Sequence, residues 1–379
     1  MKIPLYKAFT DSGDVRRVSS VLERGMNWAI GPEVAEFERA VSSYVGRRYA
    51  VAYNSGTSAL HATMLALKIG RGAEVIVPSF TFIATANAPL FVGASPVFAD
   101  IERVTYGLDP EAVERAITRR AKAMVPVHIG GIVCRYAGEL EALGRERKLL
   151  VVEDACEALG ATAKGRKGGT FGDASVLSFC ANKLISTGEG GMVLTDRKDL
   201  YERLKLVGSH GRPDRVPYFS SSTSPDYVQL GFNWRVSSMT AALGVSQMNK
   251  LERAIQLRRK VAGLLSSRLS SLNEVEVPVE PQGYRHTYQM YTVKVRGGRR
   301  SRDGLNGFLS SKGITSKVYF DPIHRTQFYR RLLGRRAPKL PVTDWVSSRV
   351  LTIPVYPRMT RDEVDYVADS VKTFFARRG

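Results

Sequence analysis

The sequence predicts an α/β protein whose core is a mostly parallel β-sheet flanked by helices. Short apolar, β-branched segments alternate along the chain with segments whose apolar residues recur at helical spacing. This alternation is typical of parallel strands joined by helical crossovers. The chain has 379 residues, which is too many for one ordinary hydrophobic core, so a large and a small domain are expected.

The first half of the chain provides the elements of the large domain. A helix is predicted to start at Pro32, because proline suits a first helical turn and Val34, Phe37, Val41 and Tyr44 then share one face. Seven buried strands are expected at residues 49–53, 74–77, 96–100, 123–127, 149–153, 174–178 and 192–195.

The second half predicts the boundary between the domains. A long helix running from residue 247 past residue 265 should bridge them, which divides the chain into a large domain, 1–248, and a small domain, 249–379. A serine-rich stretch, 218–226, is predicted to be a surface loop.

Two patterns indicate that the smaller domain is α+β. Residues 288–295 alternate like a half-exposed strand. The last helix begins with a capping box, Thr360 and Glu363. Its apolar face, which should belong to the core and not to a ligand site, consists of Val364, Val367, Val371, Phe374 and Phe375.

Lys183 is the most informative single residue. It follows a predicted strand and precedes a glycine-rich loop, 187–191, so it can be held in a pocket. A buried lysine loses basicity and can attack a carbonyl as an amine nucleophile. Most lysines are solvated surface charges, so the assignment depends on three further segments.

The first segment, residues 54–60, reads Asn-Ser-Gly-Thr-Ser-Ala-Leu and lies between a predicted strand and a predicted helix. Free backbone N–H groups and the helix dipole make such a turn a good phosphate site. An ordinary helix N-cap is an equally good explanation. The segment matches neither the Walker loop nor the GxGxxG fingerprint, so a nucleoside triphosphate or a dinucleotide has no support.

The other two segments place polar residues at possible binding edges. Asp154 ends the apolar run 149–153, and ligands collect at the carboxyl ends of parallel strands. Its carboxylate could pair with a protonated ring nitrogen or cap the next helix, whereas Glu153 should point the other way. Residues 231–237, Gly-Phe-Asn-Trp-Arg-Val-Ser, precede an alanine-rich helix and could form a binding edge or the cap of that helix.

A phosphate turn, a strand-end aspartate and a pocket lysine are together what pyridoxal phosphate requires. Their order resembles the fold-type I aminotransferases, and specifically the DegT/StrS family, which aminates nucleotide-linked keto-sugars. The resemblance covers nearly the whole chain, at residues 31–34, 37–38, 55–57, 78–82, 153–155, 172–173, 178–179, 183, 188–191, 231–235 and 322–324. It implies a seven-stranded sheet with one antiparallel strand in the large domain.

The resemblance also implies roles for single residues. Lys183 would form the Schiff base with pyridoxal phosphate, as an internal aldimine, and would carry protons between donor and acceptor carbons. Asp154 would pair with the pyridine nitrogen. The phosphate would be bound by Gly56, Thr57 and Ser178.

Further assignments of this kind concern the cofactor ring and the neighbouring subunit. Phe82 would stack on the ring. Asn233 would reach the cofactor phosphate of the neighbouring subunit, which implies a homodimer with active sites at its interface. The residues implied for the sugar-nucleotide pocket are Trp28, Tyr319 and His324.

Two positions depart from the family pattern. Glu157 stands where many members have a glutamine that contacts the phenolic oxygen of the cofactor. A carboxylate beside a phenolate is repulsive unless one of them is protonated, and Glu157 is still expected to contact the cofactor. Cys180 replaces the usual histidine or aromatic residue and is expected to be a small buried hydrophobe.

Lys183 also indicates the reaction type, because family relatives that dehydrate sugars have histidine at this position. The expected reaction is a ping-pong transamination. Glutamate would convert the cofactor to pyridoxamine phosphate, and a nucleotide-linked 4-keto or 3-keto hexose would then take the amino group. Two alternatives are an aminotransferase for a free keto-cyclitol and a non-catalytic basic relative that acts as a regulatory or nucleic-acid-binding protein.

Composition limits the other functions. The net charge is +20, but the basic residues are spread along the chain without a nucleic-acid-binding motif, so solvated faces explain them best. The five histidines are scattered and no metal motif is present. Three distant cysteines argue against a disulfide framework. No long apolar run and no signal pattern are present, so we expect no membrane association and a cytoplasmic location.

Overall fold

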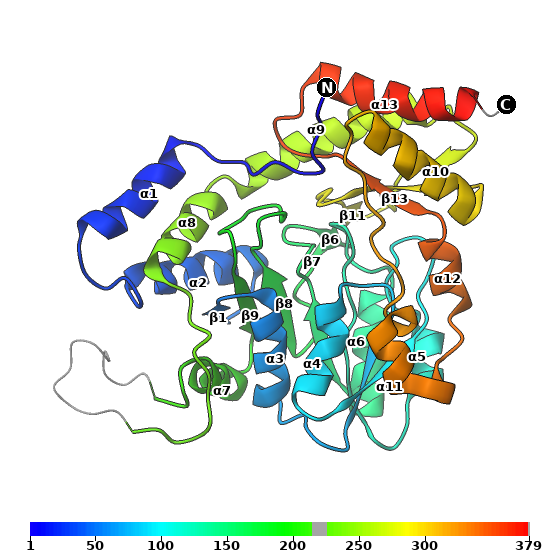
Figure 1. The fold of residues 1–379 in the computed structure, drawn as a ribbon. Coiled ribbons are helices and arrows are strands. Elements are labelled where there is room, and N and C mark those ends of the chain that lie inside the picture. Colours follow the sequence, from blue (N-terminus) through cyan, green and yellow to red (C-terminus); the bar gives the residue numbers. More distant parts are fainter. Residues whose placement is uncertain (214–225, 378–379) are drawn as a thin grey trace.

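The computed structural model describes residues 1–213 and 226–377, so the predicted loop at 218–226 lies outside the described residues except for its last position. A seven-stranded sheet in the order β1-β9-β8-β5-β4-β2-β3 forms the centre (Figure 1). Its strands are β1 (Tyr49–Tyr53), β2 (Glu74–Pro78), β3 (Ser95–Ala99), β4 (Ala121–Met124), β5 (Leu150–Asp154), β8 (Ala174–Ser178) and β9 (Gly191–Thr195).

The seven predicted strands are confirmed, with ends shifted by a few residues. Strand β9 runs antiparallel to β1 and β8, and the other neighbouring pairs are parallel. The expected single antiparallel strand is therefore confirmed as well. Because most strands are parallel, their carboxyl ends share one edge of the sheet, where ligands collect in such folds.

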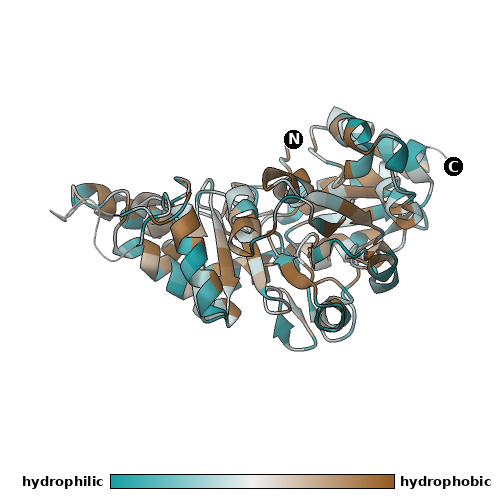
Figure 2. Ribbon diagram, turned by 90° about the horizontal axis from the view of Figure 1, so that it is seen from below, coloured by the Kyte–Doolittle hydropathy of each residue, from teal (hydrophilic) through white to brown (hydrophobic). Residues whose placement is uncertain are grey.

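Helices cover both faces of this sheet. On one face lie α3 (Gly56–Ala66), α4 (Ile83–Phe91) and α7 (Lys198–Gly208), and on the other lie α2 (Pro32–Val45), α5 (Pro110–Ala116), α6 (Ala137–Arg147) and α8 (Ser238–Met248). Side chains alternate along β1. Val51 and Tyr53 pack in the core under α3, α4 and α7, and Ala50 and Ala52 pack in the core under α2 and α8. In the view coloured by hydropathy (Figure 2), the strands are mainly brown and the outer helices carry much of the teal.

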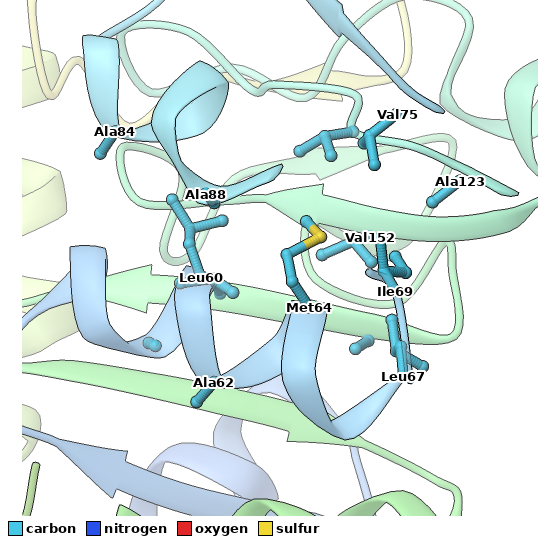
Figure 3. Close-up of a cluster of buried hydrophobic side chains, with 14 of the residues drawn as sticks. Leu60, Ala62, Met64, Leu67, Ile69, Val75, Ala84, Ala88, Ala123 and Val152 are labelled. Carbon is cyan, nitrogen blue, oxygen red and sulfur yellow. The ribbon is translucent and has the colours of Figure 1, made fainter. Parts of the chain in front are cut away.

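The core under α3 holds the functional edge of the sheet in place. Leu60 and Met64 of α3 pack in one cluster with Ala123 and Val152 of the sheet (Figure 3), and none of these four is more than 1% exposed. A fully buried side chain of the size of leucine or methionine contributes about 1.5–3 kcal/mol. Since α3 is fixed in this way, its first turn keeps a constant position relative to the strand ends.

The C-terminal part contains a second, three-stranded sheet with helices. Its elements are α9 (Leu251–Leu269), β10 (Val275–Glu276), β12 (Tyr291–Val295), α10 (Gly298–Ser311), β13 (Val350–Ile353) and α13 (Arg361–Ala376). Both members of the predicted capping box of α13 are present. The prediction of one long helix from residue 247 was wrong at its start, because α8 ends at Met248 and α9 begins at Leu251.

The N-terminal segment lies beside the C-terminal part (Figure 1). Ile3 is buried in the core formed by α9, α10 and α13, and Leu5 accepts a hydrogen bond from the Val355 amide. The division at residues 248 and 249 stays a prediction. The remaining elements are α1 (Ser12–Glu23), β6 (Thr162–Ala163), β7 (Arg166–Lys167), β11 (Tyr284–Arg285), η1 (Ile323–Arg325), α11 (Gln327–Leu333), η2 (Gly334–Arg336) and α12 (Pro341–Ser347).

Over the part of the chain that the structure describes, no helix combines the length and the apolar composition that a bilayer crossing requires.

Candidate active site

A cavity of about 500 Å³ opens where β5 and β8 end and α3 begins. It is of the size that ligand sites typically have. Eight of the eleven predicted site residues line it, namely Gly56, Thr57, Phe82, Asp154, Glu157, Ser178, Lys183 and Tyr319. The fold therefore brings together residues that lie more than 250 positions apart in the sequence.

The turn at the start of α3 forms one end of the cavity. The Ser55 hydroxyl caps the helix by accepting from the Ser58 amide at 3.1 Å. The amides of Gly56 and Thr57 belong to the first turn and so lack intrahelical partners, which suits an anion. A Cβ on Gly56 would lie 3.1 Å from Cβ of Ser178, so glycine allows this turn to approach the end of β8.

Asp154 ends β5 at the same edge and is only 5% exposed. The Thr85 hydroxyl donates to its Oδ2 at 2.7 Å, and the Cys156 amide donates to Oδ1 at 3.3 Å. Thr85 is completely buried and hydrogen-bonds in turn to Thr81 at 3.0 Å. Thr85 was not among the predicted site residues. No local pattern marks it, because its contact joins α4 to β5 across the fold.

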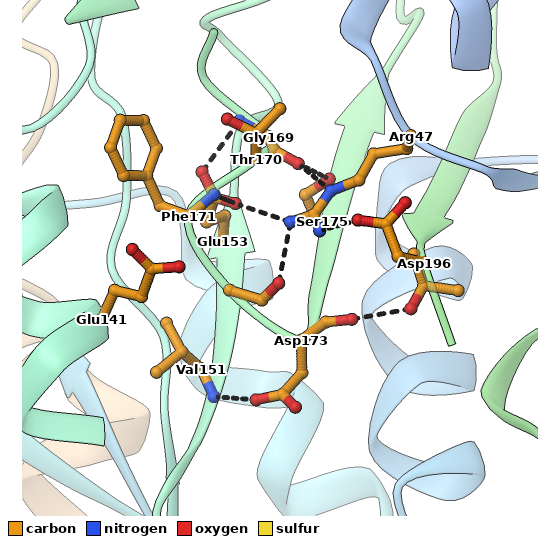
Figure 4. A network of polar contacts seen from close by, with 12 residues as sticks. Arg47, Glu141, Val151, Glu153, Gly169, Thr170, Phe171, Asp173, Ser175 and Asp196 are labelled. Atoms are coloured by element: carbon orange, nitrogen blue, oxygen red, sulfur yellow. Dashed lines mark hydrogen bonds and ion pairs between the residues drawn. The ribbon is translucent and has the colours of Figure 1, made fainter. Parts of the chain in front are cut away.

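Glu153 points away from the cavity, as alternation along β5 predicted. Its carboxylate accepts from the amides of Gly169 at 2.8 Å and Phe171 at 2.6 Å, and it lies 3.5 Å from the Arg47 guanidinium (Figure 4). On its other side, Nε2 of His128 lies 2.8 Å from Oε2. This buried network holds the end of β5 from behind, which restricts the position of Asp154.

Lys183 follows β8 and reaches into the cavity, where its side chain is 14% exposed. Its Nζ donates to Oε1 of Glu157 at 3.2 Å. Burial by itself lowers the pKa of Lys183, but the charge of Glu157, with Cys156 and Asp154, outweighs burial and raises the pKa above its ordinary value. The prediction that burial makes Lys183 less basic was therefore wrong.

A segment from the C-terminal part, residues 287–290, donates hydrogen bonds to two loops near Lys183, one at residues 130–131 and one at residue 182. The amides of Thr287 and Met290 donate to the carbonyls of Gly131 and Gly130. The Gln289 side chain donates to the carbonyl of Asn182 at 2.6 Å. Because these residues make loop contacts, β12 begins at residue 291 and not at the predicted 288.

His286, next to this segment, is expected to make the stability of the protein depend on pH. Its Nδ1 accepts from the Tyr288 amide at 2.9 Å, and burial lowers its pKa from 6.5 to about 3. Between these values the unfolded chain binds a proton that the folded protein does not, so stability falls as the pH falls. At pH 5 this histidine should lower the free energy of unfolding by about 2 kcal/mol relative to pH 7.5.

Urea unfolding at both pH values measures this effect. His286→Gln should lose that part of the pH dependence, whereas His210→Gln, which changes an exposed histidine, should keep the wild-type dependence. An identical pH dependence in His286→Gln and wild type would rule His286 out as its source.

Three predicted site residues lie outside this cavity. Asn233 is exposed and pairs with Ser209 through an isolated bridge. Trp28 is 46% exposed, and its indole N–H donates to the Val21 carbonyl at 3.1 Å. His324 is 5% exposed, with Nδ1 2.7 Å from the Ser79 hydroxyl.

Other lining residues differ from expectation or were missed. Cys180 is not a buried hydrophobe, because it lines the cavity and its thiol lies 3.5 Å from Glu189. Tyr6 and Lys317 also line the cavity; both depend on packing of the chain ends that local patterns do not reveal. Within residues 1–213 and 226–377, no three His, Cys, Asp or Glu side chains gather as metal ligands.

Comparison with known proteins gives matches along the whole chain. The model of the DegT/DnrJ/EryC1/StrS aminotransferase family matches residues 10–372. A GDP-perosamine synthase of Caulobacter vibrioides is 37% identical over 342 residues, which are 89% of each chain. Helicobacter pylori PseC, an aminotransferase involved in pseudoaminic acid biosynthesis, superimposes with a TM-score of 0.92 at 27% identity, covering 100% of both chains.

A putative sugar aminotransferase of Streptococcus pneumoniae gives a similar result. Its PLP form has a TM-score of 0.91 at 26% identity, covering 100% of this chain and 99% of that chain. The same protein is also known in a PMP form.

Proposed function

We propose that this chain, which belongs to the DegT/DnrJ/EryC1/StrS aminotransferase family, uses pyridoxal phosphate to transfer an amino group to a nucleotide-linked keto-sugar. The observation that carries this proposal is the meeting of Lys183, Asp154 and the first turn of α3 in one cavity. The residues fit the cofactor, because the cavity offers an anion site at one end, an amine, and a buried carboxylate. The relatives known in PLP and PMP forms support the same cofactor.

When bound, pyridoxal phosphate supplies a carbonyl that takes up amino groups and a ring that accepts electrons. In this proposal Gly56, Thr57 and Ser178 bind its phosphate, and Phe82 packs against its ring. Asp154, held by Thr85, keeps a proton on the ring nitrogen. Lys183 attaches the cofactor and, when displaced, takes a proton from one carbon and returns it to another.

The proposal also specifies the class of substrate. The GDP-perosamine synthases and PseC among the relatives support a sugar substrate. The proposed substrate is a nucleotide-linked 4-keto or 3-keto hexose, which would bind in this cavity beside Tyr319. Trp28 and His324 lie outside the lining of this cavity, so their part in sugar-nucleotide binding stays a prediction. Glutamate is the proposed amino donor.

Visible absorbance of the purified protein tests this function. Bound cofactor attached to Lys183 should absorb in the visible range, and glutamate should bleach that band as the amino group is taken up. Keto-sugar nucleotides should then restore the band. Restoration by a free keto-cyclitol alone would identify that alternative substrate, and a protein that stays colourless with added pyridoxal phosphate would contradict the proposal.

We also propose that the active unit is a homodimer in which Asn233 serves the neighbouring site. The exposure of Asn233 outside its own cavity supports this arrangement. Asn233→Ala and Lys183→Ala should each lower activity, and mixed dimers of the two should regain part of it, because one of their two sites is then intact. Absence of rescue in freshly exchanged mixed dimers would contradict the contact between subunits.

A further inference from the structure

We propose that Glu157 sets the pH at which Lys183 becomes a nucleophile, by holding its amine as an ammonium ion until the amine is used. The inference rests on the proposed function for its meaning, since it concerns the lysine assigned to that chemistry. Glu157 would have this role even before a cofactor binds, because it pairs with the Lys183 amine within the protein itself.

The geometry divides the two oxygens of Glu157 between two partners. Oε1 accepts from Nζ of Lys183 at 3.2 Å, and Oε2 accepts from the Gly130 amide at 2.9 Å. Glu157 is 9% exposed, so water screens this pair little. A carboxylate fixed by a backbone amide on one side presents its other oxygen to the amine in a constant direction.

Gly130 is itself held in place by the C-terminal part. The Gly130 carbonyl accepts from the Met290 amide at 2.9 Å, and the neighbouring Gly131 has a φ of 108°. A Cβ on Gly131 would lie 2.6 Å from the Gln289 amide nitrogen, so only glycine permits this approach. The position of Glu157 therefore depends on contacts that join both parts of the chain.

Charge at the amine follows from the groups that surround it. Burial opposes the ammonium form, but the Glu157 carboxylate 3.2 Å from Nζ favours it more strongly, so the pKa of Lys183 is raised. The other titratable side chains that line the cavity are Tyr6, Asp154, Cys156, Cys180, Glu189, Lys317 and Tyr319. Among them, Asp154 and Cys156 act on Lys183 in the same direction as Glu157. A glutamine at position 157 would keep the shape and remove the largest favourable charge.

The test is competitive labelling of lysine amines with acetic anhydride between pH 6 and 11, on the full chain freed of cofactor. Mass spectrometry follows Lys183, with the exposed Lys317 of the same cavity as internal reference. In Glu157→Gln the amine stays buried without its partner charge, so at pH 8 Lys183 should be labelled about tenfold faster than in wild type. Glu189→Gln, which removes a carboxylate that contacts Cys180 instead, should leave the profile unchanged.

Glu157→Asp provides a second variant in case the amide weakens folding. Its carboxylate is one methylene shorter, so the midpoint for Lys183 should lie between those of wild type and Glu157→Gln. Identical Lys183 profiles in wild type and in the folded variants would overturn the inference, as would an equal shift in Glu189→Gln. The labelling test uses neither cofactor nor substrate. A negative labelling result would therefore contradict only the role of Glu157, whereas a negative absorbance result would contradict the proposed function.

Discussion

Lys183→Ala is expected to lower kcat/KM for transamination by about 10⁴-fold, because the variant lacks both the attachment point for the cofactor and the group that moves the proton. The side chain is mostly buried beside Glu157, and the only other lysine that lines the cavity in the described chain, Lys317, is exposed. A coupled assay for glutamate consumption measures the loss. Turnover near the wild-type rate without added amine would remove Lys183 from its assigned role.

Lys183→Arg is the matched control. It keeps a positive charge next to Glu157, but a guanidinium in a protein stays protonated and cannot attack a carbonyl. It should therefore be as inactive as Lys183→Ala while it preserves the ion pair. Recovery of activity in Lys183→Arg would mean that charge at this position, and not nucleophilicity, is what the reaction needs.

Asp154→Asn is expected to retain cofactor and to lower kcat by roughly 10²–10³-fold. The amide has the shape of the carboxylate and can still accept from the Thr85 hydroxyl, which lies 2.7 Å away in the wild type. It lacks the negative charge that keeps the ring nitrogen protonated, so the ring accepts electrons less well. Cofactor absorbance at equal protein concentration reports retention, and the same coupled assay reports kcat.

Thr85→Val separates the charge of Asp154 from its orientation. Valine has the shape of threonine without the hydroxyl, so the carboxylate keeps its charge and loses one buried donor. A smaller loss, about tenfold, is expected. Full activity in Asp154→Asn would exclude the carboxylate from the reaction, and a larger loss in Thr85→Val than in Asp154→Asn would assign the main role to Thr85.

Local patterns in the sequence determined a large part of this protein. The seven strands were predictable because parallel strands buried on both faces read as short apolar runs. The alternation of β5 was enough to send Asp154 to the cavity and Glu153 to the network behind it. The start of α3 was recognisable because glycine and hydroxyl residues favour a strand-to-helix junction. That pattern alone fits a phosphate site and an ordinary helix N-cap equally well.

The positions and charges of the site residues depend on contacts between distant parts of the chain. The contacts of Glu157 with Lys183, of Thr85 with Asp154 and of residues 287–290 with the loops around Lys183 join positions 26, 69 and more than 100 residues apart. Helical and strand periodicity reports which face of an element is buried, but not which distant side chain it meets. The pKa of Lys183 depends on those distances, because burial and a nearby carboxylate act in opposite directions. For this reason the sequence alone predicted a lysine of low basicity, whereas the folded chain pairs it with Glu157.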